Sequence, residues 1–258
     1  MPETDLSLLI DAARQAGDIA RSYHGRDGLD VRTKPEDQSP VSEADLAVNA
    51  ALEARLRAAR PDYGWLSEES ADDPARQSRD RVFIVDPIDG TRSFVEGQTT
   101  WAHSIAIAEQ GKVIAGVVFL PLRDKMYTAT AGDGARLNGA PIGVSTPNAL
   151  EGAEVLATKP NFDARHWRGA VPDLKRSHRP SLAYRLSLVA EGRFDAMFTF
   201  RPSWEWDIAA GSLILAEAGA RVTDRRGAPL RFNNPHPQTD GVLGAAPRLH
   251  AELLERLA

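Results

Sequence analysis

Cysteine is absent from the 258-residue chain, and this excludes disulfides, zinc sites built from thiolates and a cysteine nucleophile. The chain also lacks an apolar run near the roughly 20 residues that a membrane-spanning helix needs. Its N-terminus has no basic segment followed by an apolar one, as a secretory signal would. These absences predict a soluble, cytoplasmic protein that does not act at a membrane.

A strong excess of one charge is missing as well. The chain has 31 Lys and Arg against 36 Asp and Glu, a formal net charge of −5, and the two signs are mixed along the sequence. Without a basic stripe, we expect no nucleic-acid polymer as a partner. A small phosphorylated molecule is still compatible with the negative total, because a bound Mg²⁺ can reverse the local field.

One stretch, residues 83–94 (FIVDPIDGTRSF), joins an apolar strand to a polar turn. The strand ends at Asp86, and Asp89 follows three residues later. Gly90 allows backbone N–H groups to approach a ligand, so both carboxylates and Thr91 can converge on one point. Hard cations such as Mg²⁺ prefer oxygen ligands and often share them with a substrate phosphate. The stretch predicts a metal and phosphate site, and the alternative is an ordinary surface turn rich in aspartate.

The order of apolar patterns predicts an α/β fold of the α+β type, layered α-β-α-β-α. Two amphipathic helices come first, then consecutive strands that form a largely antiparallel first sheet, and then helices and strands of a second, mixed sheet. We place the boundary between an N-terminal half, residues 1–145, and a C-terminal half, residues 146–258, in a loop-like region. Residues 71–81 are a charged connection and a candidate mobile flap. The expected helices are residues 4–24, 42–59, 181–191, 207–218 and 247–257.

Three motifs together resemble the inositol monophosphatase superfamily of Mg²⁺-dependent phosphatases. They are LSEE at residues 66–69, DPIDGTRSF at 86–94 and WDIAAG at 206–211, and they occur in the order and spacing of that family. The resemblance extends over nearly the whole chain. It implies hydrolysis of phosphate monoesters, two or three Mg²⁺ ions in each active site, inhibition by Li⁺ and a homodimer.

The resemblance also implies roles for particular residues. Thr91 would hydrogen-bond the attacking water and pass its proton toward Asp45, and backbone N–H groups of Gly90 and Thr91 would hold the phosphate. Local sequence offers simpler roles, since Asp45 can cap the helix that begins near residue 42 and Lys34 can be a surface lysine rather than a phosphate contact. Asp207, too, can be a helix N-cap. The metal ligands that the resemblance implies are Glu68, which also takes part in catalysis, Asp86, the carbonyl of Ile88, Asp89 and Asp207.

The substrate is predicted from the segment before Asp207. It resembles the 3'(2'),5'-bisphosphate nucleotidase branch through the string FRPSWEWDIAAG at residues 200–211, and residues 198–200 lack the Glu that inositol phosphatases use for sugar hydroxyls. Arg201, Phe200 and Trp204 offer a cation and flat apolar surface for a second phosphate and an adenine ring. We therefore expect adenosine 3',5'-bisphosphate as the substrate. Arg92 and Ser93 depart from that branch, so inositol monophosphate, histidinol phosphate and sugar phosphates stay open, as does a phosphate-sensing or protein-binding module without turnover.

Overall fold

The computed structural model describes residues 3–35, 38–147 and 149–258. A seven-stranded sheet with the order β3-β4-β5-β6-β7-β8-β9 forms one layer. β3 runs parallel to β4, and all other neighbours are antiparallel. Its strands are β3 (Gly64–Ser67), β4 (Arg81–Asp89), β5 (Ala102–Glu109), β6 (Lys112–Leu120), β7 (Lys125–Thr130), β8 (Ala135–Leu137) and β9 (Ala140–Pro141).

Strand β4 lies inside this sheet and carries the DPID sequence at its C-terminal end, so it ends at Asp89 and not at Asp86 as expected. Its residues from Val82 to Asp89 are all buried, because helices cover both faces of the sheet; this explains a continuous apolar run instead of an alternating one. The pairing with β5 joins Asp86 to Ser104 and then Asp89 to Ala102, with a shift of register between the two pairs. Such a bulge changes the direction of side chains, and here it lies between the two aspartates.

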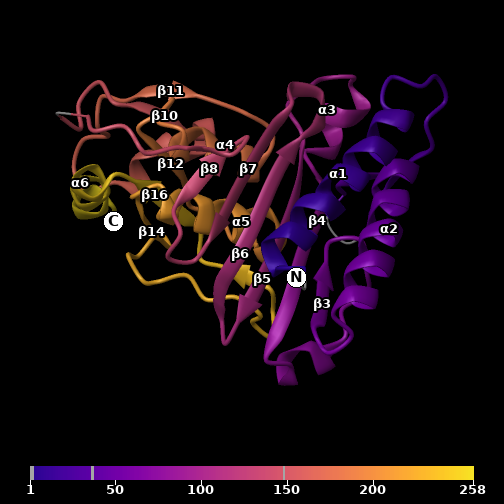
Figure 1. Cartoon of the computed structure of the whole chain (residues 1–258). Coiled ribbons are helices and arrows are strands. Elements are labelled where there is room, and N and C mark those ends of the chain that lie inside the picture. Colours follow the sequence, from indigo (N-terminus) through magenta and orange to yellow (C-terminus); the bar gives the residue numbers. More distant parts are fainter. Residues whose placement is uncertain (1–2, 36–37, 148) are drawn as a thin grey trace.

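Helices α1 (Asp5–Tyr23) and α2 (Glu43–Ala59) cover the outer face of the seven-stranded sheet (Figure 1). Their apolar sides pack with Phe83, Val85 and Val117 into one buried cluster. A short antiparallel pair, β1 (Val31–Thr33) and β2 (Pro40–Ser42), connects the two helices and ends where α2 begins.

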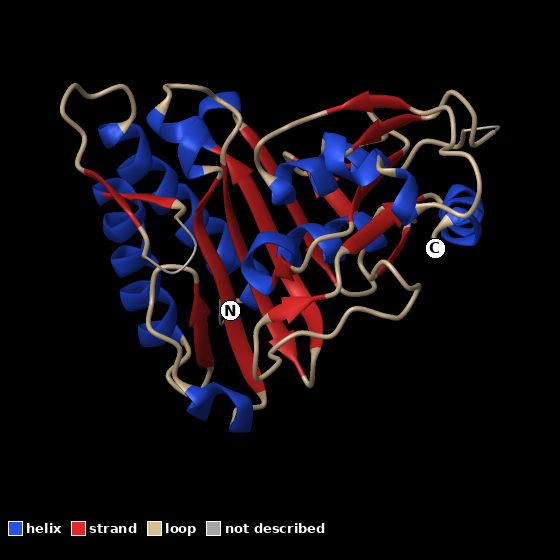
Figure 2. Cartoon of the chain, turned by 180° about the vertical axis from the view of Figure 1, so that it is seen from behind, coloured by secondary structure: helices blue, strands red, loops and turns tan. Residues whose placement is uncertain are grey.

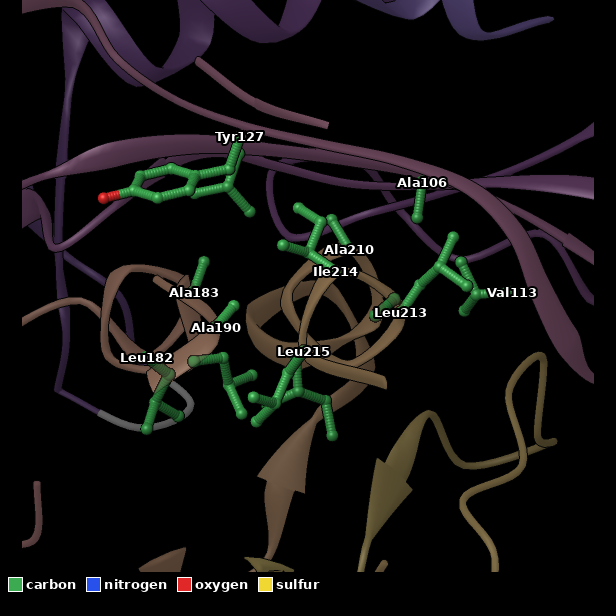
Figure 3. Packing of buried hydrophobic residues seen from close by; sticks show 14 of the residues in the cluster. Ala106, Val113, Tyr127, Leu182, Ala183, Ala190, Ala210, Leu213, Ile214 and Leu215 are labelled. Atoms are coloured by element: carbon green, nitrogen blue, oxygen red, sulfur yellow. The ribbon is translucent and has the colours of Figure 1, made fainter. Parts of the chain in front are cut away.

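Helices α4 (Leu182–Ala190) and α5 (Glu205–Glu217) form the layer between the two sheets. Every residue of α4 is buried, as expected for a helix with neighbours on all sides. Figure 3 shows Ala106, Val113 and Tyr127 of the first sheet facing the side chains of these helices.

The second sheet has the order β11-β10-β12-β16-β14 and is mixed. β10 is parallel to both β11 and β12, and β16 is antiparallel to β12 and β14. Helix α6 covers its outer face, at the end of the molecule opposite α1 and α2 (Figure 2). The bounds are β10 (Glu154–Leu156), β11 (Lys175–Ser177), β12 (Ala196–Thr199), β14 (Arg221–Thr223), β16 (Val242–Ala245) and α6 (Pro247–Arg256).

Short elements complete the described chain. A two-stranded antiparallel pair, β13 with β15, lies next to the start of α5. No helix in the described ranges is long and apolar enough to cross a membrane. The remaining bounds are β13 (Ser203–Trp204), β15 (Gln238–Thr239), α3 (Thr91–Val95) and the 3-10 helices η1 (Pro74–Ser78), η2 (Pro121–Arg123), η3 (Lys159–Phe162) and η4 (Ala164–His166).

The layered α-β-α-β-α fold, with a largely antiparallel first sheet and a mixed second sheet, confirms the expected fold class. The division of the chain after residue 145 stays a prediction. Helix α5 differs from the expectation in its start, since it begins at Glu205 rather than at Asp207. Asp207 therefore lies inside the first helical turn instead of at the N-cap.

Candidate active site

Three carboxylates converge at the C-terminal ends of β3 and β4. Glu68, Asp86 and Asp207 each offer an oxygen, and these oxygens lie within 4.8 Å of one another. Glu68 follows β3, Asp86 belongs to β4, and Asp207 reaches the cluster from the first turn of α5. The structure thus brings residues from distant parts of the sequence to one point.

The electrostatics of this cluster favour a bound cation. Burial and the neighbouring carboxylates raise the pKa values of Asp86 and Asp207 well above the usual range for aspartate. Asp86 is 1% exposed, and its buried Oδ1 has no hydrogen-bond partner among the described residues. Because a buried carboxylate oxygen is costly without a partner, this donor set fits a hard divalent cation such as Mg²⁺.

Asp89 lies beside this cluster and is bonded to the start of helix α4. Its Oδ2 accepts hydrogen bonds from Ser181 Oγ at 2.6 Å and from the backbone N–H of Ala183 at 2.7 Å. Burial raises the Asp89 pKa to about 6, although these two bonds and the charge of Arg185 act in the opposite direction. One oxygen of Asp89 therefore holds α4 in place, and its other oxygen is available to a ligand.

Thr91 and Asp45 form a hydrogen-bonded pair next to the end of β4. Thr91 Oγ1 lies 3.1 Å from Asp45 Oδ1 and 3.2 Å from the carbonyl oxygen of Ile88. Asp45 Oδ2 accepts from Ser42 N at 2.8 Å, and Ser42 Oγ accepts from Asp45 N at 3.4 Å, which together make a capping box for α2; Ser42 Oγ also lies 2.5 Å from Asp45 Oδ2. Burial raises the Asp45 pKa to about 6 against the lowering effect of the Ser42 bonds. Asp45 thus caps its helix with one oxygen and faces Thr91 with the other.

The loop that carries Glu68 is held by a cation and an amide. Lys34 Nζ donates to Glu68 Oε1 at 2.8 Å and to Glu69 Oε1 at 2.7 Å, so Lys34 is not a free surface lysine. Burial lowers its pKa, but the two carboxylates more than offset this and raise the pKa above the usual lysine value. Asn49, one turn after Asp45 on α2, accepts from Ser67 Oγ at 2.7 Å and donates to the carbonyl oxygen of Glu69 at 3.3 Å.

Gly90 connects the turn to helix α3. Its φ is +99°, a region that side chains other than glycine rarely adopt. The conformation starts α3 directly at Thr91, so the N–H groups of Gly90 and Thr91 lie at the beginning of a helix next to the carboxylates. Ile88 is buried, and its carbonyl oxygen is directed toward the Thr91 hydroxyl.

The residues that were expected to recognise the substrate lie in different environments in the structure. Arg201 is exposed, and its charge opposes the rise in the Asp207 pKa that burial and the neighbouring carboxylates cause. The expectation that Phe200 forms part of the binding surface is wrong. Its side chain is 5% exposed and stacks on Phe198, with ring centroids 5.2 Å apart, because this part of the chain follows the core strand β12. Trp204 is half-buried and stacked on Trp206 at 4.7 Å, so an aromatic surface is formed by a different pair.

The model of the inositol monophosphatase family matches residues 1–258. The chain belongs to this family. Its inositol-1-monophosphatase relative from Rhizobium meliloti is 36% identical over 234 residues, which cover 86% of each chain. A relative from Pasteurella multocida, named Nus factor SuhB, is 33% identical over 98% of this chain and 95% of its own.

Solved structures give the same result for the fold. An inositol monophosphatase of Thermotoga maritima superposes with a TM-score of 0.82, at 30% identity over 97% of this chain and 95% of that chain. The SuhB protein of Bartonella henselae superposes with a TM-score of 0.81, at 30% identity over 96% of each chain. As a member of the inositol monophosphatase family, the protein is a metal-dependent phosphoric monoester hydrolase.

Two residues that stabilise this site were not expected from the sequence. Arg185 on α4 is 4% exposed and close to Asp89 and Asp207, and burial lowers its pKa to about 10. A lone charge in the otherwise apolar segment LAYRLSLVA was a signal for it. Asn49 was missed because a polar residue in an amphipathic helix is usually solvated, and its partners, Ser67 and the Glu69 carbonyl, belong to a strand and loop about 20 residues further along the chain.

Proposed function

We propose that this phosphatase removes the 3'-phosphate from adenosine 3',5'-bisphosphate in a Mg²⁺-dependent reaction. The observation that carries the proposal is Arg201, an exposed arginine whose charge acts on Asp207 from the side of the C-terminal half. Arg185 adds a second positive charge near Asp89 and Asp207, but it is buried and donates to the carbonyl oxygens of Arg179 and Pro180. An exposed guanidinium group next to a metal and phosphate site matches a substrate with a second phosphate, because arginine binds phosphate through paired, charge-assisted hydrogen bonds.

The carboxylate that precedes Asp207 in the chain supports the same choice. Glu205 is fully buried, and both of its oxygens accept hydrogen bonds from Asn233 and Asn234. It has no free oxygen for the hydroxyl groups of a sugar or cyclitol. The region that resembles the segment of the inositol-binding glutamate is residues 198–200, which contains no acid, and Phe198 and Phe200 are core residues. An acidic group for hydroxyl recognition is therefore missing where an inositol phosphatase needs one.

The proposed reaction is direct attack of water on phosphorus, with departure of the ribose 3'-oxygen. The Thr91 hydroxyl donates to Asp45, so its oxygen can accept a proton from the attacking water while its own proton moves to Asp45. Burial raises the Asp45 pKa to about 6, which makes this carboxylate a better proton acceptor than an exposed aspartate. The N–H groups of Gly90 and Thr91 would bind the phosphate oxygens. The departing 3'-oxygen takes one proton from solvent water, and Asp45 releases the proton it received to solvent, so the proton count balances.

Mg²⁺ held by Glu68, Asp86 and Asp207, with Asp89 and the Ile88 carbonyl as further ligands, supplies Lewis-acid charge to the phosphate when it is bound. Two or three ions remain our proposal for each site. Without bound cations, Lys34 forms ion pairs with both Glu68 and Glu69, and its single positive charge offsets only part of their charge. Its ammonium group must therefore give up Glu68 or share it with the cation.

Inositol 1-phosphate is the second candidate substrate, and the comparisons favour it. The relative from Rhizobium meliloti, 36% identical, is named inositol-1-monophosphatase. Hydroxyl recognition in this chain would then need groups other than Glu205 and Phe200.

A phosphate-release assay with both substrates tests the proposal. We expect kcat/KM for adenosine 3',5'-bisphosphate to exceed that for inositol 1-phosphate by at least about tenfold, or some 1.4 kcal/mol. Arg201→Ala should reduce this preference and leave activity on a simple phosphate ester. The matched control is Arg248→Ala, because Arg248 is an exposed arginine on α6 that pairs with Glu252 on the same helix. Equal or reversed preference in the unaltered protein would place inositol 1-phosphate first.

We also propose a cytoplasmic homodimer that binds small phosphorylated molecules and no nucleic-acid polymer or membrane. The dimer rests on the family resemblance. Three large apolar side chains are exposed among the described residues, namely Val31, Leu46 and Val95 at 39%, 46% and 40%. Light scattering coupled to gel filtration measures the oligomer directly, and a mass of about 28 kDa would contradict the dimer.

A further inference from the structure

A buried arginine and a buried glutamate are both bonded to the loop at residues 231–237. Arg76 Nη1 donates to Asn233 Oδ1 at 2.5 Å, and its Nη2 donates to the carbonyl oxygen of Asn234 at 2.9 Å. Glu205 accepts from Asn233 N at 2.6 Å, Asn234 N at 2.9 Å and Asn234 Nδ2 at 2.7 Å. We call Asn233 and Asn234 the asparagine bridge, because they join the two charged side chains.

Both charges are withdrawn from water. The Arg76 side chain is 1% exposed, and Glu205 is 0% exposed. Arg76 is also paired with both oxygens of Asp72, at 2.6 and 3.0 Å. Since burial of a charge is costly unless its hydrogen bonds are made, a segment with this many satisfied bonds has a defined geometry. The chain before β4 is therefore anchored at Arg76, which the prediction of a mobile flap at residues 71–81 did not foresee.

The network connects the segments that carry the three clustered carboxylates. Arg76 belongs to η1, which lies between Glu68 and β4 with Asp86. Glu205 is in the first turn of α5, two residues before Asp207. Two residues along a helix correspond to a rotation of about 200°, so Glu205 faces the asparagine bridge while Asp207 faces the cluster. The asparagine bridge therefore contacts one side of the first turn of α5, and Asp207 lies on the opposite side of the same turn.

We propose that Glu205 is a positioning residue for the metal site: through the asparagine bridge to Arg76, it keeps Asp207 within reach of Glu68 and Asp86. The inference rests on the metal site of the proposed function and adds a residue that touches neither metal nor substrate. Replacing a residue that orients a metal ligand without touching the metal typically costs 10- to 100-fold in metal affinity or activity.

The test compares Glu205→Gln with Glu217→Gln. Glu217 lies at the other end of the same helix and also accepts two backbone hydrogen bonds, from Gly132 N and Gly134 N at 2.9 Å each. Both variants lose acceptor bonds of the same kind, but only Glu205 adjoins Asp207. Mg²⁺ binding to the folded proteins is measured by titration calorimetry without substrate, and the melting temperatures are recorded in parallel.

We expect Glu205→Gln to weaken Mg²⁺ binding by at least about tenfold and Glu217→Gln to leave it within about twofold, although both lower the melting temperature. In turnover assays, Glu205→Gln should raise the half-saturating Mg²⁺ concentration with little change in KM for the substrate. Mg²⁺ affinity within about twofold of the unaltered protein for Glu205→Gln would overturn the proposal and leave Glu205 with a role in stability alone.

Asn234→Ala is the milder variant, and it decides the matter if Glu205→Gln does not fold. It removes one side-chain bond to Glu205 and one to the Arg231 carbonyl, while both backbone bonds remain. A loss of Mg²⁺ affinity of about fivefold, the effect of one hydrogen bond, is expected, and unchanged affinity would contradict the role of the bridge.

The experiment separates this inference from the proposed function. Mg²⁺ binding that responds to Glu205 in a protein inactive on adenosine 3',5'-bisphosphate would uphold the positioning role and reject the substrate. If the protein hydrolyses that substrate but Glu205→Gln leaves Mg²⁺ affinity unchanged, the substrate proposal stands and the positioning role is rejected.

Discussion

Replacement of Thr91 by alanine removes the hydroxyl that lies between Asp45 and the carbonyl oxygen of Ile88 in the DPID motif. Thr91 is 8% exposed, and its Oγ1 lies 3.1 Å from Asp45 Oδ1. The substitution deletes one oxygen and one methyl group but no charge, so the carboxylates of the proposed metal site keep their positions. We therefore expect a loss of kcat with Mg²⁺ affinity largely retained.

The size of the loss follows from the role proposed for the pair. A positioned group that transfers a proton in the transition state contributes about 10²- to 10⁴-fold, which corresponds to roughly 2.7–5.5 kcal/mol at 1.36 kcal/mol for each factor of ten. Thr91→Ser keeps the hydroxyl and should recover most of the rate. Phosphate release at saturating Mg²⁺, repeated over a range of Mg²⁺ concentrations, measures both quantities.

A double-mutant cycle with Asp45→Asn provides the strongest test. Because both residues belong to one relay, the double variant should be about as slow as the slower single variant, instead of showing the sum of two losses. Asp45→Asn also disturbs the capping box of α2, at a cost of about 0.5–2 kcal/mol in unfolding free energy, so the folded fraction has to be checked. Additive losses, or a main effect of Thr91→Ala on Mg²⁺ affinity, would refute the relay.

Three further outcomes are expected. Asp89→Asn should nearly abolish Mg²⁺-dependent turnover with a native circular-dichroism spectrum, since the amide oxygen can still accept from Ser181 or Ala183, and normal activity with unchanged Mg²⁺ dependence would disprove the ligand role. Asp45 and Asp89 have pKa values raised from 3.8 to about 6, so the native metal-free protein holds these protons more tightly than the unfolded chain. Its unfolding free energy should fall as pH rises from about 4 to 6, by up to roughly 3 kcal/mol per group. Denaturant titrations in the presence of a chelator measure this dependence, and an unfolding free energy that does not change with pH would contradict it. Li⁺ at tens of millimolar, an estimate of the useful range, should inhibit phosphate release in an uncompetitive or noncompetitive manner, and full activity there would count against the family analogy.

The sequence predicts well those parts of the fold that depend on local periodicity. Helix α1 occupies Asp5–Tyr23 where residues 4–24 were expected, and α2 ends at Ala59 as the apolar pattern indicated. The end of the central strand was not predicted correctly: a turn was expected from Asp86 onward, but β4 continues to Asp89 because a bulge accommodates Pro87 without ending the pairing with β5. Glu68, Asp86 and Asp207 were expected to share a site, and their oxygens lie within 4.8 Å.

Features that depend on tertiary partners were not predictable in the same way. Phe200 carries no local signal that separates a core ring from an exposed one, and its burial is decided by stacking on Phe198. Arg76 resembles any charged residue of a connection, and its partners Asn233 and Asn234 lie more than 150 residues away. A charged residue is usually solvated, so only the folded arrangement identifies a buried one.

Several residues of the site perform a structural and a chemical task with different oxygens of one carboxylate. Asp45 caps α2 with Oδ2 and meets Thr91 with Oδ1. Asp89 holds the start of α4 with Oδ2, while Asp86 keeps a buried Oδ1 that has no partner in the described part of the chain. An ordinary helix cap and a functional ligand are therefore not exclusive interpretations of an aspartate. The oxygen that no protein donor reaches distinguishes a position built for a cation from one that serves the fold alone, because burial without a partner is unfavourable until the cation binds.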